Sequence, residues 1–190
     1  MTQARRDAET HAKLASLTQH VAALAGGPVL IAVDQELGGI ERLHQLVPAI
    51  PSRAQLNDLS AEAIEQRCYE MASVARCLGV HLFLAPIVDV VTGINPWLLN
   101  RHLGDDPAQV SRISCAFIRG VQRAGVIATA KHFPGHYATE HDPAIALATV
   151  HGPLELLDDN LQVFRQVIGA GVQAVMPGPA VFPAIDPDQS

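Results

Sequence analysis

Four apolar runs divide the sequence at nearly regular intervals. They cover residues 29–33, 81–87, 126–130 and 172–176, and each begins between 45 and 52 residues after the one before it. Because almost every position in a run is apolar, each run is typical of a strand buried on both faces of a parallel sheet. Parallel neighbours need a crossover connection, usually a helix, so the spacing predicts alternating strands and helices.

The stretches between the runs contain amphipathic helices with readable ends. Asp106 can cap a helix that has Pro107 at its first position, and Gly125 can end it. One face of this helix carries Val110, Ile113, Phe117 and Val121. The same signals predict further helices at residues 14–24, 60–78 and 157–168.

Strands and helices that alternate in this way form either a doubly wound sheet or a (β/α)8 barrel. The periodicity does not choose between these two folds. A complete barrel usually needs about 250 residues and eight strands. With 190 residues and four strand signals, a self-contained barrel is not expected.

The composition excludes several classes of protein. A net charge of −6 without any run of Lys and Arg argues against nucleic acid as a partner. No segment is long and apolar enough to span a bilayer, and the charged N-terminal residues do not resemble a signal peptide. The three cysteines have no metal-type spacing, so we expect reduced thiols and a cytoplasmic protein.

Polar residues follow three of the predicted strands at their carboxyl ends. The first strand runs into Asp34 and Glu36, the second into Asp89, and the third into Lys131 and the residues after it. In parallel α/β folds the loops at this edge of the sheet converge, and reactive groups collect there. The pattern predicts a polar cleft at that edge, although Asp34 and Asp89 could each simply cap a turn.

Three ordered segments carry a resemblance to a known family. They are IAVDQE at residues 31–36, NPWLLNRHLGDDP at residues 95–107, and KHFPGH at residues 131–136. Together with AVMPG at residues 174–178, they resemble the glycoside hydrolase family 3 catalytic barrel, in the branch that removes β-linked N-acetylhexosamines. The similarity covers residues 25–185 and is most specific at KHFPGH.

The resemblance implies a fold and a domain organisation. We expect an α/β fold that is a partial TIM-type (β/α)8 barrel, incomplete, with about four parallel strands. Residues 1–190 would form a single domain, with an N-terminal helix and lead-in at 1–27 and a loose tail at 178–190.

The resemblance also implies a function. Asp34, Arg101, Lys131 and His132 would hydrogen-bond the hydroxyls of a sugar, a role that suits their donors and acceptors. The implied activity is hydrolysis of β-linked N-acetylhexosamine in carbohydrate or peptidoglycan-fragment metabolism. The ligand would be a carbohydrate that contains N-acetylhexosamine, and no cofactor or metal is expected.

The sequence departs from the family at the reacting groups. The family's acid/base is a His in an Asp-Ser-His motif, and the matching stretch here ends in Ala144. Asp142 and the neighbouring His141 are therefore the catalytic candidates. The strand that carries the family's nucleophile is not found within these 190 residues. An alternative is a catalytically inactive sugar-binding pseudoenzyme or a gene fragment.

Two other hypotheses concern metal and assembly. A metal site could combine His132, His136, His141 and Asp142, although Pro134 argues against a shared helical face for the first two. Four parallel strands leave two unpaired sheet edges, and such edges recruit partners. We therefore expect the chain to associate with itself or with a complementing barrel half.

Overall fold

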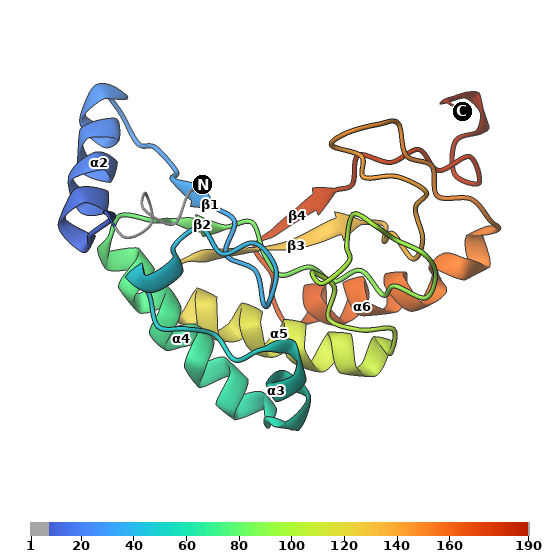
Figure 1. The fold of residues 1–190 in the computed structure, drawn as a ribbon, viewed down its shortest axis with the longest axis horizontal. Helices are drawn as coiled ribbons and strands as arrows, with labels where there is room; N and C mark the ends of the chain where they lie inside the picture. Colours follow the sequence, from blue (N-terminus) through green and yellow to red (C-terminus); the bar gives the residue numbers. More distant parts are fainter. Residues whose placement is uncertain (1–7, 190) are drawn as a thin grey trace.

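A four-stranded parallel sheet lies at the centre of the structure (Figure 1). The structure is a computed structural model that describes residues 8–189. The strands lie in the order β1-β2-β3-β4, which is also their order along the chain. Their bounds are Ala32–Val33 for β1, Leu82–Phe83 for β2, Ile127–Phe133 for β3 and Ala174–Pro177 for β4. The four apolar runs thus predicted the parallel strands correctly, although three of the strands are shorter than the runs.

Helices precede and connect the strands. The α-helices are α2 (His11–Leu24), α3 (Arg53–Asp58), α4 (Ala61–Cys77), α5 (Pro107–Arg123) and α6 (Asp158–Gly169). Short 3-10 helices are η1 (His44–Leu46), η2 (Leu154–Leu157) and η3 (Pro187–Gln189). The predicted N-caps are confirmed, because the side chains of Ser60 and Asp106 accept hydrogen bonds from the backbone of the first turn of α4 and α5.

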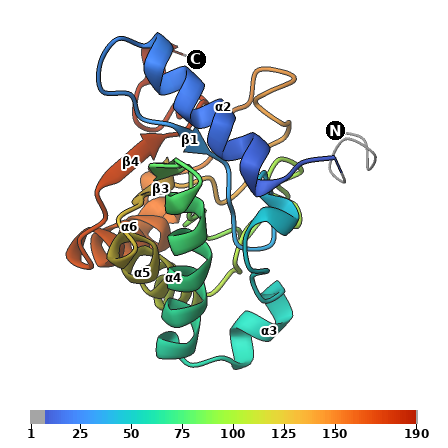
Figure 2. The same cartoon turned by 90° about the vertical axis from the view of Figure 1, so that its left-hand side faces the viewer.

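The crossover helices decide between the two possible folds. Figures 1 and 2 show α4, α5 and α6 side by side on one face of the sheet. A doubly wound sheet would place helices on both faces, whereas a barrel places all of them outside the ring of strands. The structure therefore confirms an incomplete barrel of the (β/α)8 type.

Close packing of α5 against α4 and the sheet forms most of the core. The predicted apolar face of α5 is fully buried. Gly120 on this helix allows a close approach, because a Cβ at this position would lie 2.3 Å from the carbonyl oxygen of Glu65 in α4. α5 is thus held closely against α4, and β3 follows it after a short turn.

Helix α2 is attached at one end of this core. The hydroxyl of Thr18 is buried and donates to the carbonyl oxygen of Leu78, at 2.8 Å. In contrast, Leu17, Val21 and Leu24, which the sequence pattern places on one apolar face, are exposed. Leu14, at the start of the same face, packs against the core.

Long loops follow β3 and β4 on the carboxyl side of the sheet. Val181, beyond β4, donates to the carbonyl oxygen of Ala148 and accepts from the amide of Val150, both at 2.9 Å. These bonds tie the segment after β4 to the loop after β3. None of the helices in the described part of the chain has the length and apolar character needed to cross a membrane.

Candidate functional site

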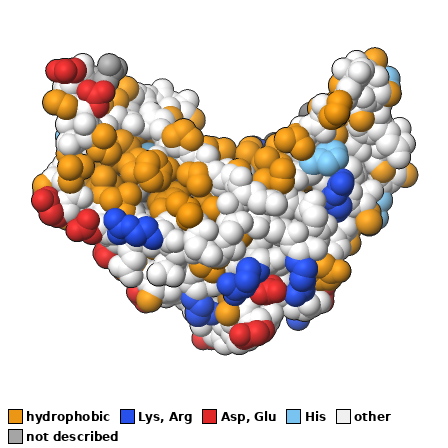
Figure 3. Space-filling view, turned by 180° about the vertical axis from the view of Figure 1, so that it is seen from behind, with side chains coloured by type: hydrophobic (Ala, Val, Ile, Leu, Met, Phe, Trp, Pro, Cys, Tyr) orange, Lys and Arg blue, Asp and Glu red, His pale blue; other side chains and the backbone are white. Residues whose placement is uncertain are grey.

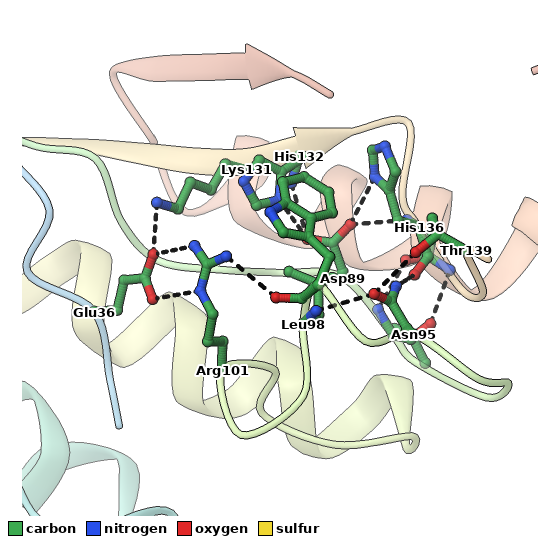
Figure 4. Close-up of polar contacts among 12 residues, drawn as sticks. Glu36, Asp89, Asn95, Leu98, Arg101, Lys131, His132, His136 and Thr139 are labelled. Carbon is green, nitrogen blue, oxygen red and sulfur yellow. Dashed lines mark hydrogen bonds and ion pairs between the residues drawn. The ribbon is translucent and has the colours of Figure 1, made fainter. Parts of the chain in front are cut away.

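The carboxyl ends of β1, β2 and β3 bring the predicted polar residues together. Asp34 directly follows β1, Asp89 follows β2, and Lys131 and His132 lie near the end of β3. The pairing of β3 with β4 shifts register between Lys131 and Phe133. Lys131 and His132 are consecutive, yet both are buried and both contact carboxylates of this cluster (Figure 4). The polar edge expected from the sequence is therefore present.

Glu36 holds the cationic side chains of the site. Its carboxylate accepts from Nε and Nη2 of Arg101 at 3.1 and 2.7 Å, and from Nζ of Lys131 at 2.7 Å. The backbone amide of Ile40 adds a further hydrogen bond at 2.8 Å. Burial alone would raise the pKa of Glu36, but these donors outweigh it and hold the pKa below its usual value. Glu36 is thus an ionised, fully partnered carboxylate that fixes both cations.

Gly39 gives this ion pair its space. A Cβ at position 39 would lie 2.2 Å from Oε2 of Glu36 and 3.2 Å from the side chain of Arg101. Any side chain at position 39 would collide with the carboxylate that Arg101 binds, so this position requires a glycine.

Asp89 organises the two histidines of KHFPGH. Its Oδ2 accepts from the amide and from Nδ1 of His132, both at 3.0 Å, and its Oδ1 accepts from the amide and from Nδ1 of His136, at 2.8 and 3.0 Å. An ionised carboxylate only accepts, so both Nδ1 atoms carry the proton. Burial raises the pKa of Asp89, but the hydrogen bonds from His132 and His136 dominate and keep it well below its usual range.

The same arrangement defines the free atom of His132. Burial lowers the pKa of His132 more than Asp89 raises it, so the ring is neutral at neutral pH. With the proton on Nδ1, the Nε2 atom carries a lone pair and can accept a hydrogen bond from a ligand hydroxyl. The Nε2 atom of His136, in contrast, is buried against Gly178, where an added Cβ would lie within 2.3 Å.

Trp97 lines the site beside His132. The two ring centroids are 4.2 Å apart, and the guanidinium of Arg101 lies 5.8 Å from the centre of the Trp97 ring. The ring also meets His136 edge-on at 5.2 Å. Trp97 is only partly buried. It therefore adds an aromatic surface to a site that otherwise consists of hydrogen-bonding groups.

Asn95 fixes the segment that carries Trp97 and Arg101. Its side-chain oxygen accepts from the amide of Leu98 at 3.0 Å and from the hydroxyl of Thr139 at 3.1 Å, while its amide donates to the carbonyl oxygen of His136 at 2.8 Å (Figure 4). The turn before Arg101 is thereby joined to the loop after β3.

The metal hypothesis needs a different set of residues from the one the sequence indicated. Within residues 8–189, Asp89, His132 and His136 offer ligand atoms that lie within 4.8 Å of one another, and His141 and Asp142 are not part of this group. Both Nδ1 atoms donate protons to Asp89, so they offer no lone pair to an ion. As arranged, the three residues form a hydrogen-bonded unit through the carboxylate of Asp89 and the two Nδ1 atoms.

The two catalytic candidates lie on the loop after β3, outside this cluster. Oδ1 of Asp142 accepts from the amide of Ala144 at 2.9 Å, and the side chain of His141 is exposed. Burial lowers the pKa of Arg101, but the carboxylate of Glu36 outweighs it and raises the pKa, with further contributions from the charges of Asp34 and Asp142. No hydrogen bond in the described part of the chain links His141 or Asp142 to Lys131 or His132.

Four predicted residues therefore lie in one site. The structure adds Glu36, Asp89 and Trp97 to them. Asp34, Arg101 and Lys131 are joined through ion pairs that include Glu36, and His132 lies against Trp97, which also contacts Arg101. From the sequence, Asp89 and Glu36 were predicted only to lie at strand ends, and Trp97 was not predicted to belong to the site. For Asp89 the signal was available, because a charge directly after a buried strand needs partners.

The fold and this site define a class of protein: a TIM-barrel-type α/β domain with its polar site at the carboxyl ends of the strands. The sequence profile of the glycosyl hydrolase family 3 N terminal domain matches residues 2–190. The chain belongs to this family.

Known relatives agree with the family and show how much of it the chain covers. A beta-hexosaminidase of Xylella fastidiosa (strain 9a5c) is 35% identical over 192 residues, which is 97% of this chain and 57% of that protein. The structure of a glycoside hydrolase family 3 beta-N-acetylglucosaminidase from Paenibacillus sp. str. FPU-7 superposes with a TM-score of 0.84 at 37% identity, over 94% of this chain and 35% of that one.

A third relative was solved with a sugar derivative. NagZ from Neisseria gonorrhoeae, in complex with N-trifluoroacetyl-D-glucosamine, superposes with a TM-score of 0.83 at 28% identity, over 94% of this chain and 54% of that one. The chain thus spans little more than half the length of the hexosaminidases it matches.

Proposed function

We propose that this chain forms the sugar-binding part of a family 3 glycoside hydrolase domain that acts on β-linked N-acetylhexosamines. The observation that carries the proposal is the cluster in which Glu36 fixes Arg101 and Lys131 beside Asp34. The names of the relatives, beta-hexosaminidase and beta-N-acetylglucosaminidase, support the choice of sugar.

The cluster has hydrogen-bonding capacity left over for a ligand. The ammonium of Lys131 has three N–H groups, and Glu36 and Asp34 take two of them. Arg101 uses three of its five N–H groups on Glu36 and on the carbonyl oxygen of Trp97. Asp34, whose side chain is 29% exposed, can accept from a hydroxyl. These groups, with Nε2 of His132, can hold several hydroxyls of one pyranose.

Trp97 would complete this site. One face of a pyranose ring is lined by C–H groups, which pack well against an aromatic surface. Because Trp97 lies against His132 and near Arg101, a sugar held by the polar groups would touch the indole ring. We therefore assign sugar contact to Trp97 in addition to Asp34, Arg101, Lys131 and His132.

For the reaction itself, we propose Asp142 and His141 as the catalytic candidates on the loop after β3. A retaining glycosidase needs a nucleophile and an acid/base on opposite sides of the scissile bond. Asp142 caps its own turn, and Ala144 stands where the family has its acid/base His. The second candidate function, a pseudoenzyme that binds the sugar without cleaving it, rests on these two observations alone.

Several other expectations stay predictions. They are the single domain at 1–190 with its lead-in at 1–27 and tail at 178–190, the cytoplasmic location, and the absence of a nucleic-acid partner and of a cofactor. Self-association, or pairing with a complementing barrel half, is also a prediction.

Titration calorimetry with N-acetylglucosamine tests the proposed site. The wild-type chain should bind, and Asp34→Asn should weaken binding by about tenfold or more, because a charge-assisted hydrogen bond contributes about 1.5 to 3 kcal/mol. Asp188→Asn, at an exposed carboxylate far along the sequence, is the matched control and should leave the affinity unchanged. Equal affinity in Asp34→Asn and wild type would refute the assignment.

A further inference from the structure

Helix α6 carries a polar residue on its buried face. That face consists of Asn160, Val163, Phe164 and Val167, and Asn160 is only 1% exposed. Apolar side chains lie outside instead: Ile168 of the same helix is exposed, and Figure 3, which views the molecule from behind, shows hydrophobic side chains gathered on the side that carries β4. Burial of a polar side chain costs free energy unless the side chain is hydrogen-bonded, so the surroundings of Asn160 are informative.

Both polar atoms of the Asn160 side chain bond to the backbone of one residue. Oδ1 accepts from the amide of Val90 at 2.8 Å, and Nδ2 donates to the carbonyl oxygen of Val90 at 3.3 Å. A residue of a neighbouring strand can form the same pair of bonds. The side chain of Asn160 therefore takes the place of a strand partner at Val90.

These bonds fix the backbone on one side of Asp89. On the other side, the amide of Val88 donates to the carbonyl oxygen of Lys131 at 2.7 Å. Asp89 thus lies between two anchored residues, Val88 and Val90. Its carboxylate is held in place before any ligand binds, because the chain is bonded on both sides of it and the side chain accepts from both histidines of KHFPGH (Figure 4).

Asn160 also lies against the turn that carries these histidines. A Cβ on Gly135 would lie 2.2 Å from the Cβ of Asn160, so this position has room for a glycine alone. Gly135 stands between His132 and His136, and its amide donates to the carbonyl oxygen of His132 at 2.8 Å. Asn160 therefore touches both parts of the hydrogen-bonded unit, the segment with Asp89 and the turn with the histidines.

We propose that Asn160 is a positioning residue for the sugar site and that it acts through Asp89. By fixing the segment at Val90 against the turn at Gly135, it lets Asp89 keep the proton of His132 on Nδ1. The lone pair of His132 then lies on Nε2, where it accepts from a hydroxyl of the ligand. This inference rests on the proposed function, because that function makes a sugar the ligand of His132. Asn160 itself does not touch the sugar, since it is buried and bonded to Val90.

Nitrogen NMR of the histidine rings tests the position of the proton without any ligand. In the wild-type chain His132 should have a protonated Nδ1 and an unprotonated Nε2, and comparison with His132→Asn assigns its signals. Asn160→Ala should give a mixture of the two tautomers, because Asp89 is then held on one side only. Val167→Ala, a buried change on the same face of α6, is the matched control. It should lower the melting temperature but leave the tautomer of His132 unchanged.

Calorimetry with N-acetylglucosamine measures the consequence for binding. Asn160→Ala should bind about three- to tenfold more weakly than wild type, because a neutral hydrogen bond contributes about that factor. Val167→Ala should bind like wild type. Asn160→Asp keeps an acceptor for the amide of Val90, the shorter of the two bonds, and should recover part of the lost affinity. A merely structural role predicts instead that the affinity follows the melting temperature in all three variants.

The two measurements separate this inference from the proposed function. A wild-type chain that does not bind N-acetylglucosamine would refute the proposed function, and the NMR spectra would still decide whether Asn160 holds the proton of His132. The inference is overturned if Asn160→Ala keeps the wild-type tautomer, or if it loses that tautomer while its affinity stays equal to that of a wild type that binds. The same effects in Val167→Ala would also overturn it. Circular dichroism monitors folding, and Asn160→Ser replaces Asn160→Ala if the alanine variant does not fold.

Discussion

Two neighbouring regions at the carboxyl side of the sheet differ in how their charged groups are held. At the ends of β1, β2 and β3, Glu36 and Asp89 are buried and each accepts four hydrogen bonds or ion pairs from fixed partners. On the loop after β3, His141 is exposed and Asp142 bonds to its own turn.

This difference matters because a glycosidase needs groups that hold the sugar and groups that react with it. Groups that hold a substrate must be positioned before it arrives, and the cluster around Glu36 and Asp89 meets that requirement. A catalytic acid needs a defined distance to the bond it protonates, whereas on the loop His141 is exposed and Asp142 accepts from the amide of Ala144. The following predictions test this contrast between the two regions.

The largest expected difference is in stability. Asp89→Ala should lower the free energy of unfolding by about 3 to 5 kcal/mol, because it removes a buried carboxylate that four donors share. Asp142→Ala removes a single turn-capping bond and should cost about 1 kcal/mol or less. Urea unfolding of both variants gives the comparison. Similar losses would mean that the two regions are equally structured.

The sequence predicted one of these regions better than the other. Strand positions followed from the apolar runs, and helix ends followed from Ser60 and Asp106, because burial and capping are encoded locally. The strand-end rule placed Asp34 and Lys131 in one site. The partner of Glu36 was not predictable, because Arg101 is 65 residues away and only the fold brings them together.

Two other features lay outside what a sequence pattern contains. Periodicity gives the apolar face of a helix but not the side of the sheet on which the helix packs, so it could not choose between barrel and doubly wound sheet. The family resemblance predicted the barrel, and the structure confirms it. Trp97 lies in a turn without periodicity, and its place beside His132 depends on the hydrogen bonds of Asn95.

The next largest effect concerns ligand affinity. Lys131→Met should weaken N-acetylglucosamine binding by about 1.5 to 3 kcal/mol, since it removes a charged donor fixed by Glu36. Lys13→Met changes the only other lysine of the sequence, which is exposed on α2, and should leave the affinity unchanged. Calorimetry measures both. Loss of binding in Lys13→Met would point to a site elsewhere on the molecule.

A smaller effect is expected from pH. Burial lowers the pKa of His132 in the folded chain, below the value of about 6.5 that an unfolded chain has. The unfolded state therefore takes up the proton first as the pH falls. Stability that is fully present above that value should decline on acidification from pH 7 to pH 5. His132→Asn should reduce this decline in thermal melting, whereas His20→Asn, at an exposed site, should not.

The smallest expected signal is turnover. We predict negligible release of chromophore from a chromogenic β-N-acetylglucosaminide by the 190-residue chain, because Ala144 cannot donate a proton. His141→Ala should accordingly leave the rate of chromophore release unchanged. Steady release that disappears in His141→Ala or Asp142→Ala would show that the loop does position an acid/base.

The most direct test of the central claim is a fluorescence titration. Trp97 is the only tryptophan of the sequence and lies against His132, so its emission reports on the proposed site alone. Titration with N-acetylglucosamine should give a saturable change in emission from the wild-type chain, at the affinity found by calorimetry, and Lys131→Met should shift the curve to higher concentration. Heat of binding without any change in Trp97 emission would place the sugar elsewhere and contradict the account.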